Sequence, residues 1–259
     1  MTPAAAAGTW TLGDLTVNRM GLGAMRLTGA RPRGDAIAVL RRAVELGVNH
    51  IDTAAFYFSG PRSANELINS ALSPYPDDLV ITTKVWPGRD PSGEWWWATP
   101  AQLRGQVEEN LRQLGRDHLD VVNLRLPPSQ RDGSLAAHFE VLAGLRQEGL
   151  IRHLGISNVT AAHLTEARTI APVVCVQNRF EALQDDLLPT CGELGIAYVP
   201  FFTLASGVDA AAAHGATAAQ VRLAQTLRLG PHVLAIPGTG DPAHLEDNVA
   251  AAALSLSLS

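Results

Sequence analysis

The chain has 259 residues, of which 46% are hydrophobic and 17% are charged, and its formal net charge is −5. This length allows a large core and fits one α/β barrel as well as two smaller domains. The 20 Lys and Arg residues are scattered, no apolar run reaches the length of a membrane span, and the first residues lack signal-peptide features, so we expect a soluble cytoplasmic protein without a nucleic-acid or membrane partner.

Strand-like and helix-like segments alternate along the sequence. Residues 8–17 alternate polar and apolar side chains about a Gly-Asp turn, which predicts a β-hairpin. Eight apolar runs then predict strands at 19–23, 48–52, 79–85, 119–124, 152–156, 173–177, 197–202 and 233–236. Amphipathic stretches of helical period predict helices at 35–47, 63–72, 99–115, 134–149, 160–170, 187–195, 217–230 and 241–254.

This alternation predicts a (β/α)8 TIM barrel, with the N-terminal hairpin capping its bottom and residues 1–259 forming a single domain. A doubly wound sheet is the alternative, but it needs fewer strands or a second domain, and no linker-like boundary is visible. The active site of a barrel lies at the carboxyl ends of its strands. Asp52, Lys84 and Arg125 stand at such ends, and Tyr57 lies in the loop that follows Asp52.

These four side chains have the chemistry that carbonyl reduction needs. A free Tyr phenol titrates near pH ~10 and donates its proton poorly at neutral pH. A neighbouring Lys ammonium stabilises the phenolate, and an Asp paired with that Lys keeps it charged and oriented, so that Tyr57 becomes a general acid. The alternative is structural: Asp52 caps a helix, Lys84 is solvated, Tyr57 is a half-buried aromatic, and Arg125 forms a salt bridge away from substrate.

The segments NHIDTAAFY, VITTKV, LDVVNLR, GISN, VQN and IPGT occur in this order, and as a set they resemble the aldo-keto reductase superfamily from about residue 9 to residue 253. The resemblance implies a barrel enzyme that transfers hydride from NADPH to an aldehyde or ketone without a metal. It makes Tyr57 the proton donor, tuned by Asp52 and Lys84. Arg125 stands where members usually have His, so the resemblance is to a bacterial-type member with a permanent cation that donates hydrogen bonds but does not titrate.

No Gly-x-Gly-x-x-Gly fingerprint is present, and the resemblance implies a dinucleotide that lies extended across the barrel mouth. It places Phe201 where a Tyr usually stacks on the nicotinamide, and Thr239 at a helix N-terminus that favours anions. Gly238 and His244 stand where many members have Lys or Arg, so we expect NADPH with NADH as a possibility. The full implied set is Gly23, Ala24, Met25, Asp52, Ser157, Asn158, Gln177, Phe201, Phe202, Thr203, Leu204, Gly238, Thr239, Gly240, His244, Asp247 and Asn248.

The loop WPGRDPSGEWWWATP, which follows the Lys84 strand, holds four of the five Trp residues. Because such loops build the substrate pocket in a barrel, it predicts an aromatic-lined pocket for a bulky or aromatic carbonyl compound. The alternative is that these rings pack on the loop itself or on another subunit. The predicted pocket residues are Phe56, Phe58, Trp86, Trp95, Trp96, Trp97 and Arg125.

Two other functions are compatible with the same residues. A nucleotide-sensing regulatory subunit would keep the cofactor site, although the presence of Asp52, Tyr57 and Lys84 favours turnover. An alcohol dehydrogenase that runs mainly toward oxidation is favoured by Arg125, because a fixed cation stabilises the Tyr57 phenolate. The histidine spacings match no metal site, and we expect a monomer or a weak homo-oligomer that acts on a small-molecule carbonyl substrate.

Overall fold

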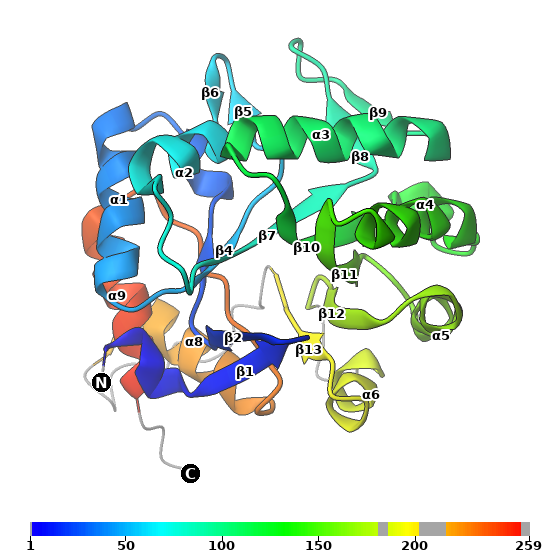
Figure 1. The fold of residues 1–259 in the computed structure, drawn as a ribbon. Coiled ribbons are helices and arrows are strands. Elements are labelled where there is room, and N and C mark those ends of the chain that lie inside the picture. The colour runs from blue at the N-terminus through cyan, green and yellow to red at the C-terminus, as the bar shows by residue number, and fades with distance from the viewer. Residues whose placement is uncertain (1, 181–185, 202–215, 255–259) are drawn as a thin grey trace.

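The computed structural model describes residues 2–180, 186–201 and 216–254. One parallel sheet of seven strands forms most of a ring, in the order β13-β12-β11-β10-β7-β4-β3 (Figure 1). The sheet order therefore follows the chain order, as each strand lies beside the next one in sequence. The strands are β3 (Leu22–Gly23), β4 (His50–Asp52), β7 (Val80–Val85), β10 (Leu119–Arg125), β11 (Ile151–Ser157), β12 (Val173–Gln177) and β13 (Ala197–Tyr198).

The segment predicted as the eighth strand closes the ring between β13 and β3. Parallel bridges join Tyr198 to Val233 and Met20 to Ala235, and Leu234 donates its backbone N–H to the Tyr198 carbonyl at 2.9 Å. Pro237 has no N–H to donate, which shortens this pairing to isolated bridges rather than a continuous strand. The predicted (β/α)8 barrel is confirmed, while the assignment of all of 1–259 to one domain stays a prediction.

The predicted helices surround the sheet. The ends of α3 follow these sequence signals: the 3-10 turn Pro100–Gln102 that leads into it begins with a reciprocal capping box of Thr99 and Gln102 and has Pro100 at its first position. Gly115 ends α3 with a left-handed φ of 63°. The helices are α1 (Arg33–Glu45), α2 (Ala64–Leu72), α3 (Leu103–Leu114), α4 (Ala136–Gln147), α5 (Ala161–Ile170), α6 (Leu187–Glu193), α8 (Ala218–Arg228) and α9 (Pro242–Ala250). No helix in the described ranges is long and apolar enough to cross a membrane.

The predicted hairpin is formed by β1 (Thr9–Leu12) and β2 (Leu15–Asn18). Its buried residues Leu12 and Val17 belong to the same apolar cluster as Val80, Val121 and Leu234, which come from the first half of the ring strands. The hairpin therefore closes the bottom of the barrel, as predicted, and leaves the carboxyl ends of the strands as its mouth.

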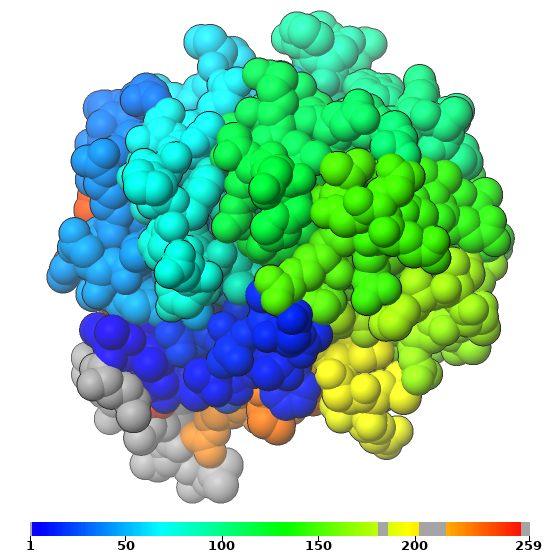
Figure 2. Space-filling view, viewed as in Figure 1, coloured from blue at the N-terminus to red at the C-terminus, as the bar shows by residue number. Residues whose placement is uncertain are grey.

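Two further hairpins rise from the mouth, and the sequence did not predict them. The first pairs β5 (Phe58–Ser59) with β6 (Arg62–Ser63), and the second pairs β8 (Pro87–Arg89) with β9 (Trp95–Trp97). They form the two lobes that project at the top of Figure 2. The Trp triplet, which the sequence places in a loop, forms the strand β9, since aromatic side chains favour extended, paired backbone.

Candidate active site

Asp52 and Lys84 form a buried ion pair at the mouth of the barrel. The Lys84 Nζ lies 2.6 Å from Asp52 Oδ1, and the two side chains are only 2% and 4% exposed. Lys84 also donates to the Thr53 carbonyl at 2.9 Å. Two charges removed from water in this way depend on each other, so the pair fixes both side chains in place.

Gln177, at the end of β12, holds the other side of the Asp52 carboxylate. Its Nε2 donates to Asp52 Oδ2 at 2.7 Å. The Gln177 Oε1 is buried and accepts no hydrogen bond from residues 2–180, 186–201 or 216–254. Buried acceptors are nearly always satisfied in folded proteins, so this oxygen is placed to receive a donor from a ligand in the cavity.

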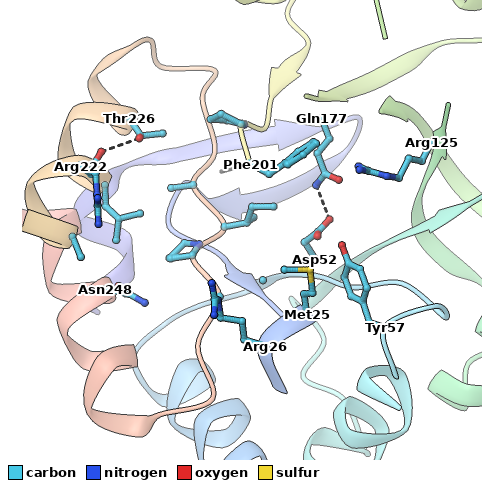
Figure 3. Close-up of a pocket in the computed structure, with 18 of the residues that line it drawn as sticks. Met25, Arg26, Asp52, Tyr57, Arg125, Gln177, Phe201, Arg222, Thr226 and Asn248 are labelled. Carbon is cyan, nitrogen blue, oxygen red and sulfur yellow. Dashed lines mark hydrogen bonds between the residues drawn. The ribbon is translucent and has the colours of Figure 1, made fainter. Parts of the chain in front are cut away.

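Tyr57 lies next to the ion pair. The Lys84 Nζ is 4.9 Å from the centroid of the Tyr57 ring, and the Phe56 ring packs edge-on at a centroid distance of 5.1 Å. The loop is held by backbone hydrogen bonds from Tyr57 to Ala54 at 3.0 Å and from Ala64 to Tyr57 at 2.9 Å. Figure 3 shows the Tyr57 hydroxyl directed toward Asp52 and into the same space as Arg125.

Arg125 ends β10 on the opposite side of this space. Its Nη1 donates to Ser157 Oγ at 3.1 Å, and its Cζ lies 4.9 Å from the centroid of the Phe201 ring. Burial lowers the pKa of Arg125, whereas the charges of Tyr57 and Asp52 raise it, and the guanidinium stays protonated at neutral pH. In the described part of the chain no carboxylate forms a salt bridge with it, so its charge faces the cavity.

A chain of hydrogen-bonded, buried amides and hydroxyls holds the carboxyl ends of β4 and β7 from outside the ring. Thr53 Oγ1 donates to Asn65 Oδ1 at 2.7 Å, and Asn65 Nδ2 donates to Asn110 Oδ1 at 3.0 Å. Thr83 Oγ1 donates to the same Asn110 oxygen at 2.6 Å, and Asn110 Nδ2 donates to the Gln106 carbonyl at 2.8 Å. Helices α2 and α3 thereby fix the residues adjacent to Asp52 and Lys84. This network was not predicted from the sequence, although an Asn stands at a core-facing position of each helix and could have indicated it.

Replacing Asn110 with Ala is expected to lower the free energy of unfolding by about 1–3 kcal/mol, because Asn65 and Thr83 each lose the acceptor of a buried hydrogen bond. Urea denaturation measures the change. Glu108→Ala, at an exposed position of the same helix, is the matched control and should change stability by only about 0.5 kcal/mol or less. Equal stability of the two variants would contradict this role of the network.

One cavity of about 530 Å³ joins these groups (Figure 3). Tyr57 and Arg125 lie at one end and Asn248 lies at the other. The predicted site residues that line it are Gly23, Met25, Asp52, Phe56, Tyr57, Trp95, Arg125, Gln177, Phe201, Gly238 and Asn248.

The structure does not bring every predicted substrate-pocket residue into the cavity. Trp86 is buried and stacks on His138 at a centroid distance of 3.8 Å, away from the lining residues. Phe58 borders a separate hollow beside Arg89. Trp96 and Trp97 are 39% and 42% exposed. Of the predicted aromatic side chains, Trp95 and Phe56 line the cavity beside Arg125, and their rings meet edge-on at 5.4 Å.

Several residues implied for catalysis or for the cofactor also lie outside the lining. Lys84 and Ser157 are buried behind Asp52 and Arg125, and Asn158, with a φ of 62°, donates to the Leu126 carbonyl at 2.9 Å. The others are Ala24 and Thr239, which are buried, and Gly240, His244 and Asp247 around the start and outer face of α9. Phe202, Thr203 and Leu204 lie outside the described residues.

Lining residues that the sequence analysis did not single out come mainly from α8 and from the segment that closes the ring. They are Arg26, Pro200, Ala219, Arg222, Leu223, Thr226, Ala235, Ile236 and Pro237. The four residues on α8 are spaced i, i+3, i+4 and i+7, so they share one face of the helix. That spacing was visible in the sequence, but it does not by itself separate a cavity face from a core face. Within the described ranges, no three His, Cys, Asp or Glu side chains converge to hold a metal ion.

A (β/α)8 barrel with a buried Asp–Lys pair beside a Tyr at its mouth defines the class of barrel oxidoreductases. The sequence model of the Aldo/keto reductase family matches residues 19–211. The chain therefore belongs to the aldo-keto reductase family and is an oxidoreductase.

Individual relatives agree with this assignment. Pyridoxine 4-dehydrogenase of Escherichia coli (strain K12) is 46% identical over 97% of this chain and 95% of its own length. An aldo-keto reductase from Klebsiella pneumoniae, solved in complex with NADPH, has a TM-score of 0.78 and 30% identity over 93% of this chain and 88% of its own. A glycerol dehydrogenase from Gluconobacter oxydans has a TM-score of 0.83 over 98% of this chain and 92% of its own, but at 21% identity it shows the fold alone.

Proposed function

We propose that this protein reduces an aldehyde or ketone with NADPH, and that Tyr57 gives a proton to the carbonyl oxygen. The observation that carries the proposal is the buried contact of 2.6 Å between Lys84 and Asp52, with the same ammonium 4.9 Å from the Tyr57 ring centroid. As the proton leaves the phenol, negative charge develops on Tyr57. An ammonium held in a water-poor site stabilises that charge more strongly than water does.

The cavity fits a nicotinamide nucleotide. Gln177 Oε1 is a buried acceptor with no donor among the described residues, which suits the carboxamide N–H₂ of nicotinamide. The Phe201 ring lines the same region, and an aromatic ring needs only its face for offset stacking. NADPH supplies the hydride when it is bound, while the protein orients its ring and supplies the proton.

For the substrate we propose an aromatic aldehyde, with pyridoxal as the first compound to test. Phe56 and Trp95 line the cavity beside Tyr57, and Arg125 adds a cation. The similarity to pyridoxine 4-dehydrogenase supports the same substrate class. The experiment compares NADPH consumption with pyridoxal and with an aliphatic aldehyde of similar size. Turnover of neither compound would contradict the proposal and favour the nucleotide-sensing alternative.

The reverse direction is the second candidate function. Arg125 lines the same cavity as Tyr57, and a permanent cation there stabilises the negative charge that develops on an alcohol oxygen as its proton leaves. Rates with pyridoxine and NADP⁺ and with pyridoxal and NADPH, measured from pH 6 to 9, distinguish the two directions.

We further propose that the enzyme works in the cytoplasm as a monomer or weak homo-oligomer, with neither nucleic acid nor membrane as a partner, because its scattered charges offer neither of them a surface.

Replacing Arg125 with Ala is expected to lower kcat/KM for aldehyde reduction by about 10-fold to 100-fold, because the carbonyl loses a charged hydrogen-bond donor. Arg125→His should recover part of the loss and make the rate fall as pH rises through the titration of the imidazole. Arg131→Ala removes an exposed cation from the same strand-to-helix connection and serves as the control. A loss of about twofold or less in Arg125→Ala would contradict a contact between Arg125 and the carbonyl.

A further inference from the structure

Two arginine side chains line the end of the cavity that lies away from Tyr57. Arg26 follows β3, and Arg222 is on α8. Figure 3 shows Arg222 near Asn248 on the far side of the cavity, with Arg26 between them and the catalytic end. No carboxylate forms an ion pair with either guanidinium among the residues that the structure describes. The charges of both are therefore available to a ligand.

The face of α8 leaves room for a nucleotide beside Arg222. Ala219 stands one turn before Arg222 on the lining face, and its small side chain does not fill the space. Thr226 stands one turn after, and its hydroxyl donates to the Arg222 carbonyl at 2.8 Å. The Thr226 hydroxyl is thus bound to its own helix, which leaves the Arg222 guanidinium as the strong donor of this face.

The N-terminus of α9 is already occupied by a protein carboxylate. Asp241 caps the helix by accepting from the Ala243 N–H at 2.9 Å, and it also forms an ion pair with Arg31. His244 stands 3.9 Å from the same carboxylate, with its side chain 70% exposed. A phosphate at this helix end would meet negative charge instead of free N–H groups. The sequence analysis had placed the anion site around Thr239, Gly240 and His244.

We propose that Arg222, together with Arg26, binds the 2′-phosphate of NADPH, so that α8 rather than α9 sets the preference for NADPH over NADH. This rests on the proposed function in that the cavity takes a nicotinamide nucleotide. A phosphate monoester carries about −1.5 to −2 charges at pH 7, which two guanidinium groups match. They replace the two cations that the chain lacks at Gly238 and His244.

Calorimetric titration without substrate tests the proposal. The dissociation constants of NADP⁺ and NAD⁺ are measured for the parent, Arg222→Gln, Arg222→Lys and Arg26→Gln. Arg222→Gln should weaken NADP⁺ binding by about 10-fold to 100-fold and NAD⁺ binding by less than about threefold, since only NADP⁺ loses a charged contact. Arg222→Lys should keep part of the affinity, and Arg26→Gln should act in the same direction. Adenosine 2′,5′-bisphosphate should show the same loss relative to 5′-AMP.

Arg168→Gln, which removes an exposed cation from α5, controls for the change in net charge and should leave both constants unchanged. Equal weakening of NADP⁺ and NAD⁺ in Arg222→Gln would overturn the proposal and assign Arg222 to the adenine or the pyrophosphate. A selective loss in His244→Gln but not in Arg222→Gln would overturn it in favour of α9. If the parent binds neither nucleotide, the proposed function itself fails, and that result is distinct from both of these.

Discussion

Replacing Tyr57 with Phe is expected to lower kcat for aldehyde reduction by about 10²–10⁴-fold, the usual contribution of a positioned general acid. The variant loses one hydroxyl at the cavity wall and keeps the ring that packs against Phe56 and Lys84. The buried ion pair and Gln177 are untouched, so nucleotide affinity should not change. Single-turnover reduction of pyridoxal, with NADPH preloaded, measures the chemical step directly.

Tyr75→Phe is the matched control for this variant. The Tyr75 hydroxyl donates to the Leu114 carbonyl at 2.6 Å, and burial raises its pKa to about 12, so it stays protonated at neutral pH. Its loss should cost about 0.5–1.5 kcal/mol of stability and leave kcat unchanged. Retention of more than about a tenth of the parent kcat by Tyr57→Phe would show that another group or water delivers the proton.

The sequence was sufficient for the barrel and for the catalytic end of its cavity. Strand ends are marked by a change from apolar to polar residues, and parallel topology brings the ends of neighbouring strands together, so the proximity of Asp52 and Lys84 follows from order alone. Gln177 ends β12, which β11, β10 and β7 separate from β4, and it reaches Asp52 across the mouth of the ring. The hydrogen bond from Gln177 to Asp52 was not predictable, because side-chain direction within the ring depends on register. The structure supplies that register by pairing Asp52 with Thr82, which places Lys84 two residues further along its strand.

The residues at the outer end of the cavity were harder to predict from the sequence than those at the catalytic end, for two physical reasons. His244 matches a family position, but its side chain is 70% exposed, lies 3.9 Å from Asp241 and does not line the cavity. Arg222 lies on an amphipathic helix among Ala and Leu residues, where a single cation resembles a solvated side chain. The prediction that Trp86 and Trp96 line the substrate pocket was wrong for another reason. Trp86 adopts a φ of 94° and its ring stacks on His138, while Trp96 packs over Gly88.

The Asp52–Lys84 pair should show the largest combined effect on stability and catalysis. Lys84→Met leaves the Asp52 carboxylate buried, with Gln177 as the side-chain donor that remains to it within the described part of the chain. Breaking one side of a buried ion pair costs about 3–5 kcal/mol, and kcat should fall as well, because the phenolate of Tyr57 loses its ammonium. Chemical denaturation and steady-state kinetics measure the two losses.

The double variant Asp52→Asn/Lys84→Met separates these two roles. It removes both charges, and an Asn amide still has an oxygen that accepts from Gln177, so most of the lost stability should return. Catalysis should not return, because the variant lacks the Lys84 ammonium that lies 4.9 Å from the centroid of the Tyr57 ring. If the double variant recovers kcat together with stability, the ion pair is only a structural support, and proton donation by Tyr57 does not depend on it. If neither recovers, the Lys84 contact with the Thr53 carbonyl, rather than the charge on Asp52, holds the mouth of the barrel together.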